Sequence, residues 1–156
     1  MADNLTTYDA VVDWISYVAT GAGSNEFWYG VPSEINVKHN RDYPVFSVYP
    51  DNTSITNKDL QSETYQARTS FRCWIWYDYP DANSDNAGNQ LQSRQSSAQD
   101  MAFDVIRRFM FESETKNGSF MFDNAGINLQ FFEEQGTDRI CGVSFTITIS
   151  YYETCK

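Results

Sequence analysis

The longest regular alternation of hydrophobic and polar positions lies in residues 139–152, near the end of the chain. Alternation with a period of two predicts a β-strand with one face in a core and the other face wet or lightly covered. At about 3.4 Å per residue this strand would extend roughly 45 Å, well beyond the usual strand of five or six residues. Its predicted core face carries Cys141, Val143, Phe145, Ile147, Ile149 and Tyr151, and its other face carries Gly142, Ser144, Thr146, Thr148, Ser150 and Tyr152.

A second long strand is predicted over residues 63–79. One of its faces is mainly apolar, and the other face is polar up to Arg72 and then carries Trp74 and Trp76. A strand that becomes aromatic on both faces must enter a covered environment, and a helix, a loop or another subunit would supply that cover. The nearest candidates are residues 25–31, which include Trp28, or an adjacent subunit. The apolar face carries Tyr65, Ala67, Phe71, Cys73, Ile75 and Tyr77.

Apolar residues at helical spacing predict helices over residues 6–20 and 91–113. The first helix begins at a capping box of Thr6 and Asp9, and Gly21 and Gly23 end it. Its apolar stripe is Val11, Val12, Ile15, Val18 and Ala19, and that of the second helix is Ala98, Met101, Ala102, Val105, Ile106, Phe109 and Met110.

Shorter strands and polar loops connect these elements. Pro50 and the two residues after it predict a loop that runs to about Ser62, and residues 80–90 predict another. Short strands are predicted over residues 34–39, 43–49, 119–123 and 126–133, and residues 25–31 suit a short strand or an extended loop. The pattern therefore predicts an α+β fold in one domain of residues 1–156: one mainly antiparallel sheet, two helices packed on one of its faces, and long strands or a projecting hairpin.

The composition excludes some functions. The chain has a formal net charge of −10, and an acidic domain is not expected to hold nucleic acid by counterion release, which needs clustered Lys and Arg, although it could lie beside DNA without binding it. Cys73, Cys141 and Cys155 form no C-x-x-C pair, and Cys73 and Cys141 occur on apolar strand faces, which predicts buried thiols in a reducing cytoplasm. We expect no signal peptide, because the first residues lack its basic and apolar regions, and no membrane span, because no run of 18 apolar residues occurs.

Few residues suggest catalysis or cofactor binding. Asp81, Asn83 and Asp85 resemble the start of a calcium loop, but Asn86 replaces its tight-turn glycine and Gln92 its bidentate glutamate, so we expect no metal. The single histidine, His39, is flanked by polar residues and is predicted to lie in an exposed loop. We therefore expect no catalytic residues and no cofactor.

Tryptophans are the candidate interaction residues. Trp28, Trp74 and Trp76 would form either a sugar-stacking platform or part of a core and a subunit interface, and aromatic side chains are common interface anchors. We predict that at least one of Trp74 and Trp76 lies at a subunit boundary. Trp76→Ala would then fold but fail to enter an assembly.

The layout of the chain resembles that of the tail-completion, tail-terminator and neck-ring proteins of tailed bacteriophages. The residues that carry the resemblance are an N-terminal helix, the strand beginning Tyr43-Pro44-Val45-Phe46, the strand Phe71-Arg72-Cys73-Trp74-Ile75-Trp76, an amphipathic helix, a hairpin and a last strand rich in Thr and Ile that ends in tyrosines. The resemblance implies a homo-oligomeric ring at the head–tail junction or tail end, with no catalytic residues.

The sequence therefore predicts a virion structural protein rather than an enzyme. Its expected partners are further copies of itself, neighbouring portal, connector or tail proteins, and genomic DNA that passes through the ring without sequence-specific binding. It would occur in the virion and, during assembly, in the host cytoplasm. The alternative is a carbohydrate-binding module that uses exposed tryptophans, and a small hydrolase is a third hypothesis.

Overall fold

The computed structural model describes residues 7–32, 41–59, 64–80, 87–115, 120–123, 126–134 and 140–154. Within these residues the fold is α+β, with two helices and a mostly antiparallel mixed sheet of six strands, as predicted. The helices are α1 (Thr7–Gly21) and α2 (Ala87–Thr115). The strands are β1 (Glu26–Tyr29), β2 (Val45–Asp59), β3 (Thr64–Asp78), β4 (Phe120–Phe122), β5 (Gln130–Glu134) and β6 (Ile140–Thr154).

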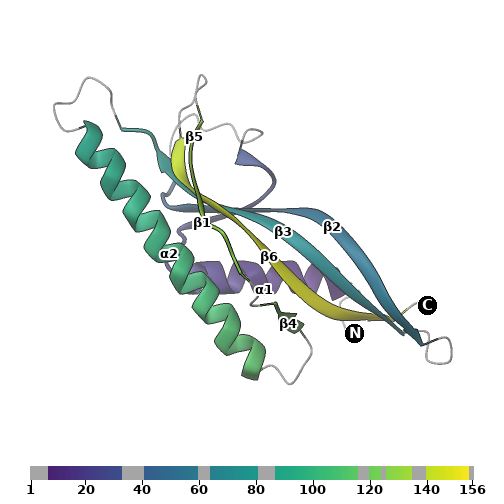
Figure 1. Cartoon of the computed structure of the whole chain (residues 1–156). Coiled ribbons are helices and arrows are strands. Elements are labelled where there is room, and N and C mark those ends of the chain that lie inside the picture. The colour runs from purple at the N-terminus through teal and green to yellow at the C-terminus, as the bar shows by residue number, and fades with distance from the viewer. Residues whose placement is uncertain are drawn as a thin grey trace.

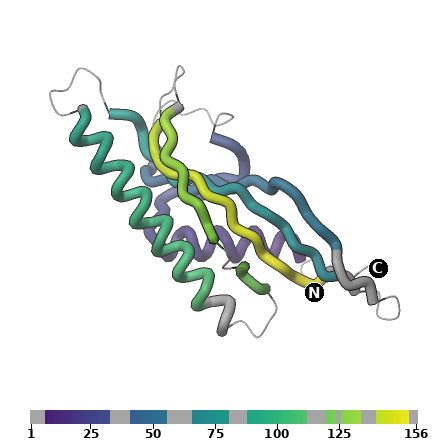
Figure 2. The backbone as a smooth tube through the Cα atoms, in the orientation of Figure 1, coloured from purple at the N-terminus to yellow at the C-terminus, as the bar shows by residue number. Residues whose placement is uncertain are grey.

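The sheet is organised around β6. Its strand order is β1-β2-β3-β6-β4, and β5 also pairs with β6, beside its N-terminal half. Only β1 is parallel to its neighbour, β2. Figure 1 shows α1 behind the sheet and α2 alongside β6 and β4. The tube in Figure 2 shows β2, β3 and β6 running side by side, as their pairing requires.

The predicted alternation of β6 is confirmed. All six apolar positions, from Cys141 to Tyr151, are buried, whereas Thr146 and Tyr152 on the other face are exposed. The pairing of β3 with β6 places Phe71 opposite Ile147 and Cys73 opposite Phe145, so the apolar faces of the two strands form one surface. Side chains from α1 and α2 join this surface in the main core. Cys73 is buried in this core, Cys141 is also buried, and both are free thiols. Burial raises the pKa of Cys141 to about 11.

The prediction of a loop from Pro50 to Ser62 is wrong, because β2 continues through Pro50 to Asp59. A β-bulge between Pro50 and Asn52 inserts one extra residue, which lets the strand pass the proline and still pair with β3. Before the bulge Phe46 and Val48 belong to the core; after it Thr53 pairs with buried Thr69.

The first helix ends as the sequence predicted. Gly23 has a positive φ of 110°, and the amide of Ser24 donates to the carbonyl of Ala19 at 3.0 Å. The amide of Gly23 donates to the carbonyl of Thr20 at 3.1 Å. These two bonds form a Schellman motif, which satisfies the last carbonyls of the helix and turns the chain into β1.

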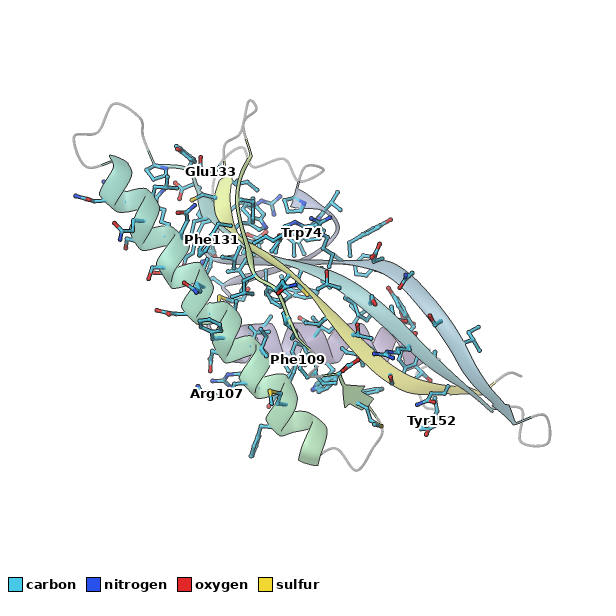
Figure 3. All side chains as sticks on the ribbon, viewed as in Figure 1. Trp74, Arg107, Phe109, Phe131, Glu133 and Tyr152 are labelled. Carbon is cyan, nitrogen blue, oxygen red and sulfur yellow. The ribbon has the colours of Figure 1, made fainter. Side chains whose placement is uncertain are left out.

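The second helix begins at Ala87, before the predicted residue 91, and three of its large apolar residues are exposed. Phe109 is fully buried, but Met110, which was predicted on the apolar side, is 41% exposed. Trp14, absent from the predicted stripe of α1, packs edge-on against Phe109 with 5.0 Å between ring centroids. Figure 3 shows Arg107 and Phe109 on opposite sides of α2.

Other predictions are partly tested. β5 begins at Gln130, so residues 126–129 are not part of the strand predicted over 126–133. The predicted strand over 34–39, the capping residue Thr6, His39, and the loop with Asp81, Asn83 and Asp85 lie outside the described residues.

We expect Phe145→Ala to lower the free energy of unfolding by about 3–5 kcal/mol, because Phe145 is only 3% exposed and its removal leaves a cavity in the main core. Thr146→Val is the control, since Thr146 is the exposed neighbour on the opposite face. Urea denaturation followed by circular dichroism measures both. If both variants lost the same free energy of unfolding, the assignment of Phe145 to the core face of β6 and of Thr146 to the opposite face would be wrong.

Candidate functional site

A second, smaller hydrophobic cluster lies on the face of the sheet opposite the main core. It consists of Val45, Trp74, Trp76 and Ile140, with Val31, Tyr43 and Phe132 packed against it. Val45 pairs with Trp76 across β2 and β3, so the cluster occupies the end of the sheet where β2 begins. We call these seven residues the tryptophan cluster.

The cover of the tryptophan cluster comes from the chain itself. β1 lies parallel to β2, and the amide of Gly30 donates to the carbonyl of Val48 at 2.9 Å. The Asn25 side chain donates to the carbonyl of Tyr43 at 2.7 Å. These bonds hold the segment that contains Trp28 and Val31 beside the start of β2.

Trp76 is fully buried within the cluster. Its indole Nε1–H donates to the Ser47 hydroxyl at 2.8 Å, and the Tyr43 ring meets it edge-on at 5.7 Å. Opposite it on β6 stands Gly142, where an added Cβ would lie 1.9 Å from the carbonyl oxygen of Ile75. Only glycine therefore lets β3 and β6 approach so closely at this point.

The three candidate tryptophans differ in exposure. Trp76 has no exposed surface and Trp74 is 8% exposed, whereas Trp28 is 37% exposed. The Arg41 guanidinium lies 5.8 Å from the centre of the Trp28 ring and also pairs with Glu26. An added Cβ at Gly30 would lie 2.3 Å from Trp28 Nε1, so the chain passes directly against this indole. Of the three, Trp28 offers the largest surface to a partner.

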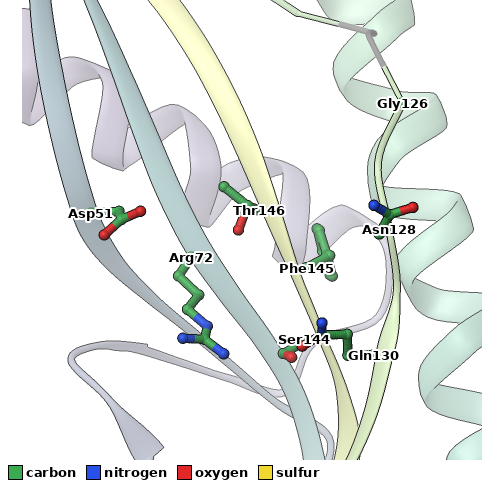
Figure 4. Close-up of a pocket in the computed structure, with 8 residues that line it drawn as sticks. All are labelled: Asp51, Arg72, Gly126, Asn128, Gln130, Ser144, Phe145 and Thr146. Carbon is green, nitrogen blue, oxygen red and sulfur yellow. The ribbon is translucent and has the colours of Figure 1, made fainter.

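A polar hollow of about 360 Å³ adjoins the tryptophan cluster (Figure 4). Its floor comes from β3 and β6, and its rims come from β2 on one side and the segment leading into β5 on the other. The lining residues are Asp51, Arg72, Gly126, Asn128, Gln130, Ser144, Phe145 and Thr146. Sequence reasoning placed Arg72 on this face, but nothing in the local pattern indicated that residues 126–130 would form the opposite rim.

The described residues supply polar groups at the hollow and aromatic groups at the tryptophan cluster. Among them, no cluster of three or more His, Cys, Asp and Glu side chains is arranged to hold a metal ion. The described helices include none that is both long and apolar enough to cross a bilayer. No protein-family model and no curated protein matches the chain.

The outer side of α2 is a further exposed surface. Phe103 is 54% exposed and Phe111 is 64% exposed, with Arg107 between them in sequence. Asp104 pairs with both Arg107 and Arg108, and its hydrogen bond from Arg107 holds its pKa below the usual value. This side of the helix therefore combines large apolar side chains with a small ionic network.

We expect Gly142→Ala to lower the free energy of unfolding by about 3 kcal/mol or more, because its Cβ would overlap the backbone of β3. Gly126→Ala is the matched control, since an added Cβ there meets no atom within 4 Å. Thermal unfolding of the two variants gives the comparison. A Gly142→Ala protein as stable as Gly126→Ala would mean that the two strands lie further apart.

The burial of Trp76 changes the expected result of its truncation. We now expect Trp76→Ala to cost about 3–5 kcal/mol of stability, rather than to leave the fold intact as the sequence suggested. Trp28→Ala is expected to cost about 1 kcal/mol or less, because Trp28 is partly exposed. Chemical denaturation measures both, and a Trp76→Ala protein with parental stability would contradict the burial of this residue.

Proposed function

We propose that this chain is a virion structural protein: a subunit of a homo-oligomeric ring at the phage head–tail junction or the tail-completion position. In this proposal its partners are identical subunits and neighbouring portal, connector or tail proteins. It would be found in the virion and, before that, in the host cytoplasm. The observation that carries the proposal is a small subunit that leaves large apolar side chains exposed on several of its elements.

These exposed side chains are spread over the helices and the sheet. Phe103, Met110 and Phe111 lie on α2, Met121 lies on β4 and Phe131 lies on β5, and each is at least 41% exposed. Large apolar groups that remain in water give a lone monomer no stability, whereas burial between subunits removes them from water. Each subunit of a ring contacts two neighbours, so it has two interfaces in which these side chains would be buried.

The three longest strands favour the same proposal. β2, β3 and β6 have 15 residues each, which corresponds to about 50 Å of extended chain. We infer that both helices cover one face of this sheet and that β2 and β3 continue past them as a hairpin towards a neighbour. Ile55 supports this, because it pairs with buried Ala67 and yet is 61% exposed.

The charge of the chain suits a channel through which DNA moves. The formal net charge is −10, and most described arginines are neutralised by a carboxylate partner. Like charges repel, so DNA inside such a ring would slide without sequence-specific contact.

The alternative function, a carbohydrate-binding module, relies on exposed tryptophans. Trp74 and Trp76 are buried by their own chain, so they offer no flat surface for a sugar. Trp28 with Tyr49, which is 44% exposed, would have to supply the platform instead. We therefore favour the ring subunit.

Mass photometry and negative-stain imaging of the purified protein test the proposal. We expect a discrete mass several-fold above 18.0 kDa and ring-shaped particles. The Phe103→Ser, Phe111→Ser double variant should shift the population towards monomer by tenfold or more, because interface anchors typically contribute about 2 kcal/mol.

Asp100→Asn is the matched control, since Asp100 is an exposed polar residue of the same helix. Circular dichroism checks that all variants are folded. A folded protein that stays monomeric both alone and with purified phage tails or portals would contradict the proposal.

A further inference from the structure

Arg72 differs from the other arginines whose side chains are described. Arg41, Arg68 and Arg94 pair with Glu26, Asp123 and Asp78, and Arg107 and Arg108 share Asp104. Within the described part of the chain, Arg72 has no carboxylate partner, although the chain contains 21 acidic residues. An exposed, unpaired guanidinium beside a hollow is a group with unused hydrogen-bond donors.

Trp74 holds the Arg72 side chain in place. The guanidinium carbon lies 5.5 Å from the centre of the Trp74 ring, and Trp74 itself is 8% exposed within the tryptophan cluster. The contact of a guanidinium with an aromatic ring leaves N–H donors at its edge available. Because Trp74 is fixed by its own packing, the donors of Arg72 are oriented before any ligand arrives, which lowers the entropy lost on binding.

The groups around Arg72 are mostly neutral. Ser144 pairs with both Trp74 and Gln130 in the sheet register, and Thr146 pairs with Arg72 itself. Figure 4 shows Ser144 and Gln130 side by side on the floor and rim, with Asn128 further along the same rim. Hydroxyl and amide groups of this kind donate to or accept from a polar ligand without adding charge.

Asp51 limits the charge that the hollow accepts. It lies on β2, on the rim opposite Asn128, so a ligand in the hollow meets one cation and one anion (Figure 4). A nucleic acid or another polyanion would be repelled by this carboxylate and by the net charge of −10. A ligand that carries one carboxylate for Arg72 and a hydroxyl or amine directed towards Asp51 matches this pair of charges.

We propose that the hollow is a carboxylate-binding site in which Arg72, stacked on Trp74, holds the carboxylate and Ser144, Gln130 and Asn128 hydrogen-bond to its neighbouring polar groups. A planar guanidinium binds a carboxylate through two parallel N–H···O bonds. The carboxylate comes from one of two sources: an Asp or Glu side chain of a second copy of this chain, or a small acid such as a uronic acid. This site does not depend on the ring assembly proposed above.

Intrinsic tryptophan fluorescence tests the small-acid source, because Trp74 lies beneath Arg72. Sodium acetate and sodium glucuronate are titrated into the protein at constant ionic strength, with methyl glucoside as the uncharged control. We expect saturable changes with the acids, at least tenfold weaker binding for Arg72→Gln, and a smaller loss for Arg72→Lys, which keeps the charge but not the fork. Arg107→Gln, on the outer side of α2, should bind as the parent does.

Sedimentation velocity tests the second-copy source. If a carboxylate of another copy occupies the hollow, Arg72→Gln should weaken self-association at least tenfold, and glucuronate should compete with self-association. Arg94→Gln is the control here, because Arg94 pairs with Asp78 and does not line the hollow, and it should associate as the parent does. Glucuronate binding without any effect on self-association assigns the site to a small acid. If Arg72→Gln retains parental acid titrations and parental self-association, or if methyl glucoside binds as well as glucuronate, the proposal is wrong.

Discussion

The pairing of β3 with β6 is the interaction on which the rest of the structure depends. The two strands are paired in register from Thr64–Thr154 to Asp78–Ile140, so their alternating side chains fall on the same two faces over the full length. One face contributes to the main core, which also contains side chains of α1 and α2, and the other holds the tryptophan cluster and the polar hollow. The glycine opposite Trp76 allows this pairing to continue where the largest side chain is buried.

The parts of the fold that arise from local periodicity could be predicted from the sequence. The faces of β6 and the apolar side of α1 were recognisable because alternation and helical spacing depend only on the geometry of one element. Pro50 misled the prediction, since the β-bulge that accommodates it depends on pairing with β3. Trp14 was missed because its burial requires Phe109 and Phe120, which are distant in sequence.

The candidate site, too, could be predicted only where it depends on the pattern within one strand. The sequence placed Arg72, Trp74 and Trp76 on one strand face and recognised that the tryptophans need a cover. It named residues 25–31 or an adjacent subunit as that cover, and Val31 of this segment does pack against the tryptophans. It did not identify Tyr43 and Phe132, which reach them from two further segments. Likewise, Asn128 and Gln130 become neighbours of Arg72 only through the pairing of β5 with β6. A site assembled from non-local strand pairs leaves no motif in the sequence.

The bulge in β2 also determines how the distal end of the sheet can vary. The bulge contributes a single unpaired residue. Before it, the even-numbered residues of β2 lie on the same face as Phe71, and after it the odd-numbered residues do. Insertions or deletions of two residues beyond Asn52 would preserve which side chains face each layer, whereas a change of one residue would reverse them all. A second register shift, between Thr56 and Asp59, adds another residue to β2 relative to β3 and returns the alternation to its first parity. This part of the sheet can therefore change in length only in steps of two, unless a bulge is gained or lost at the same time.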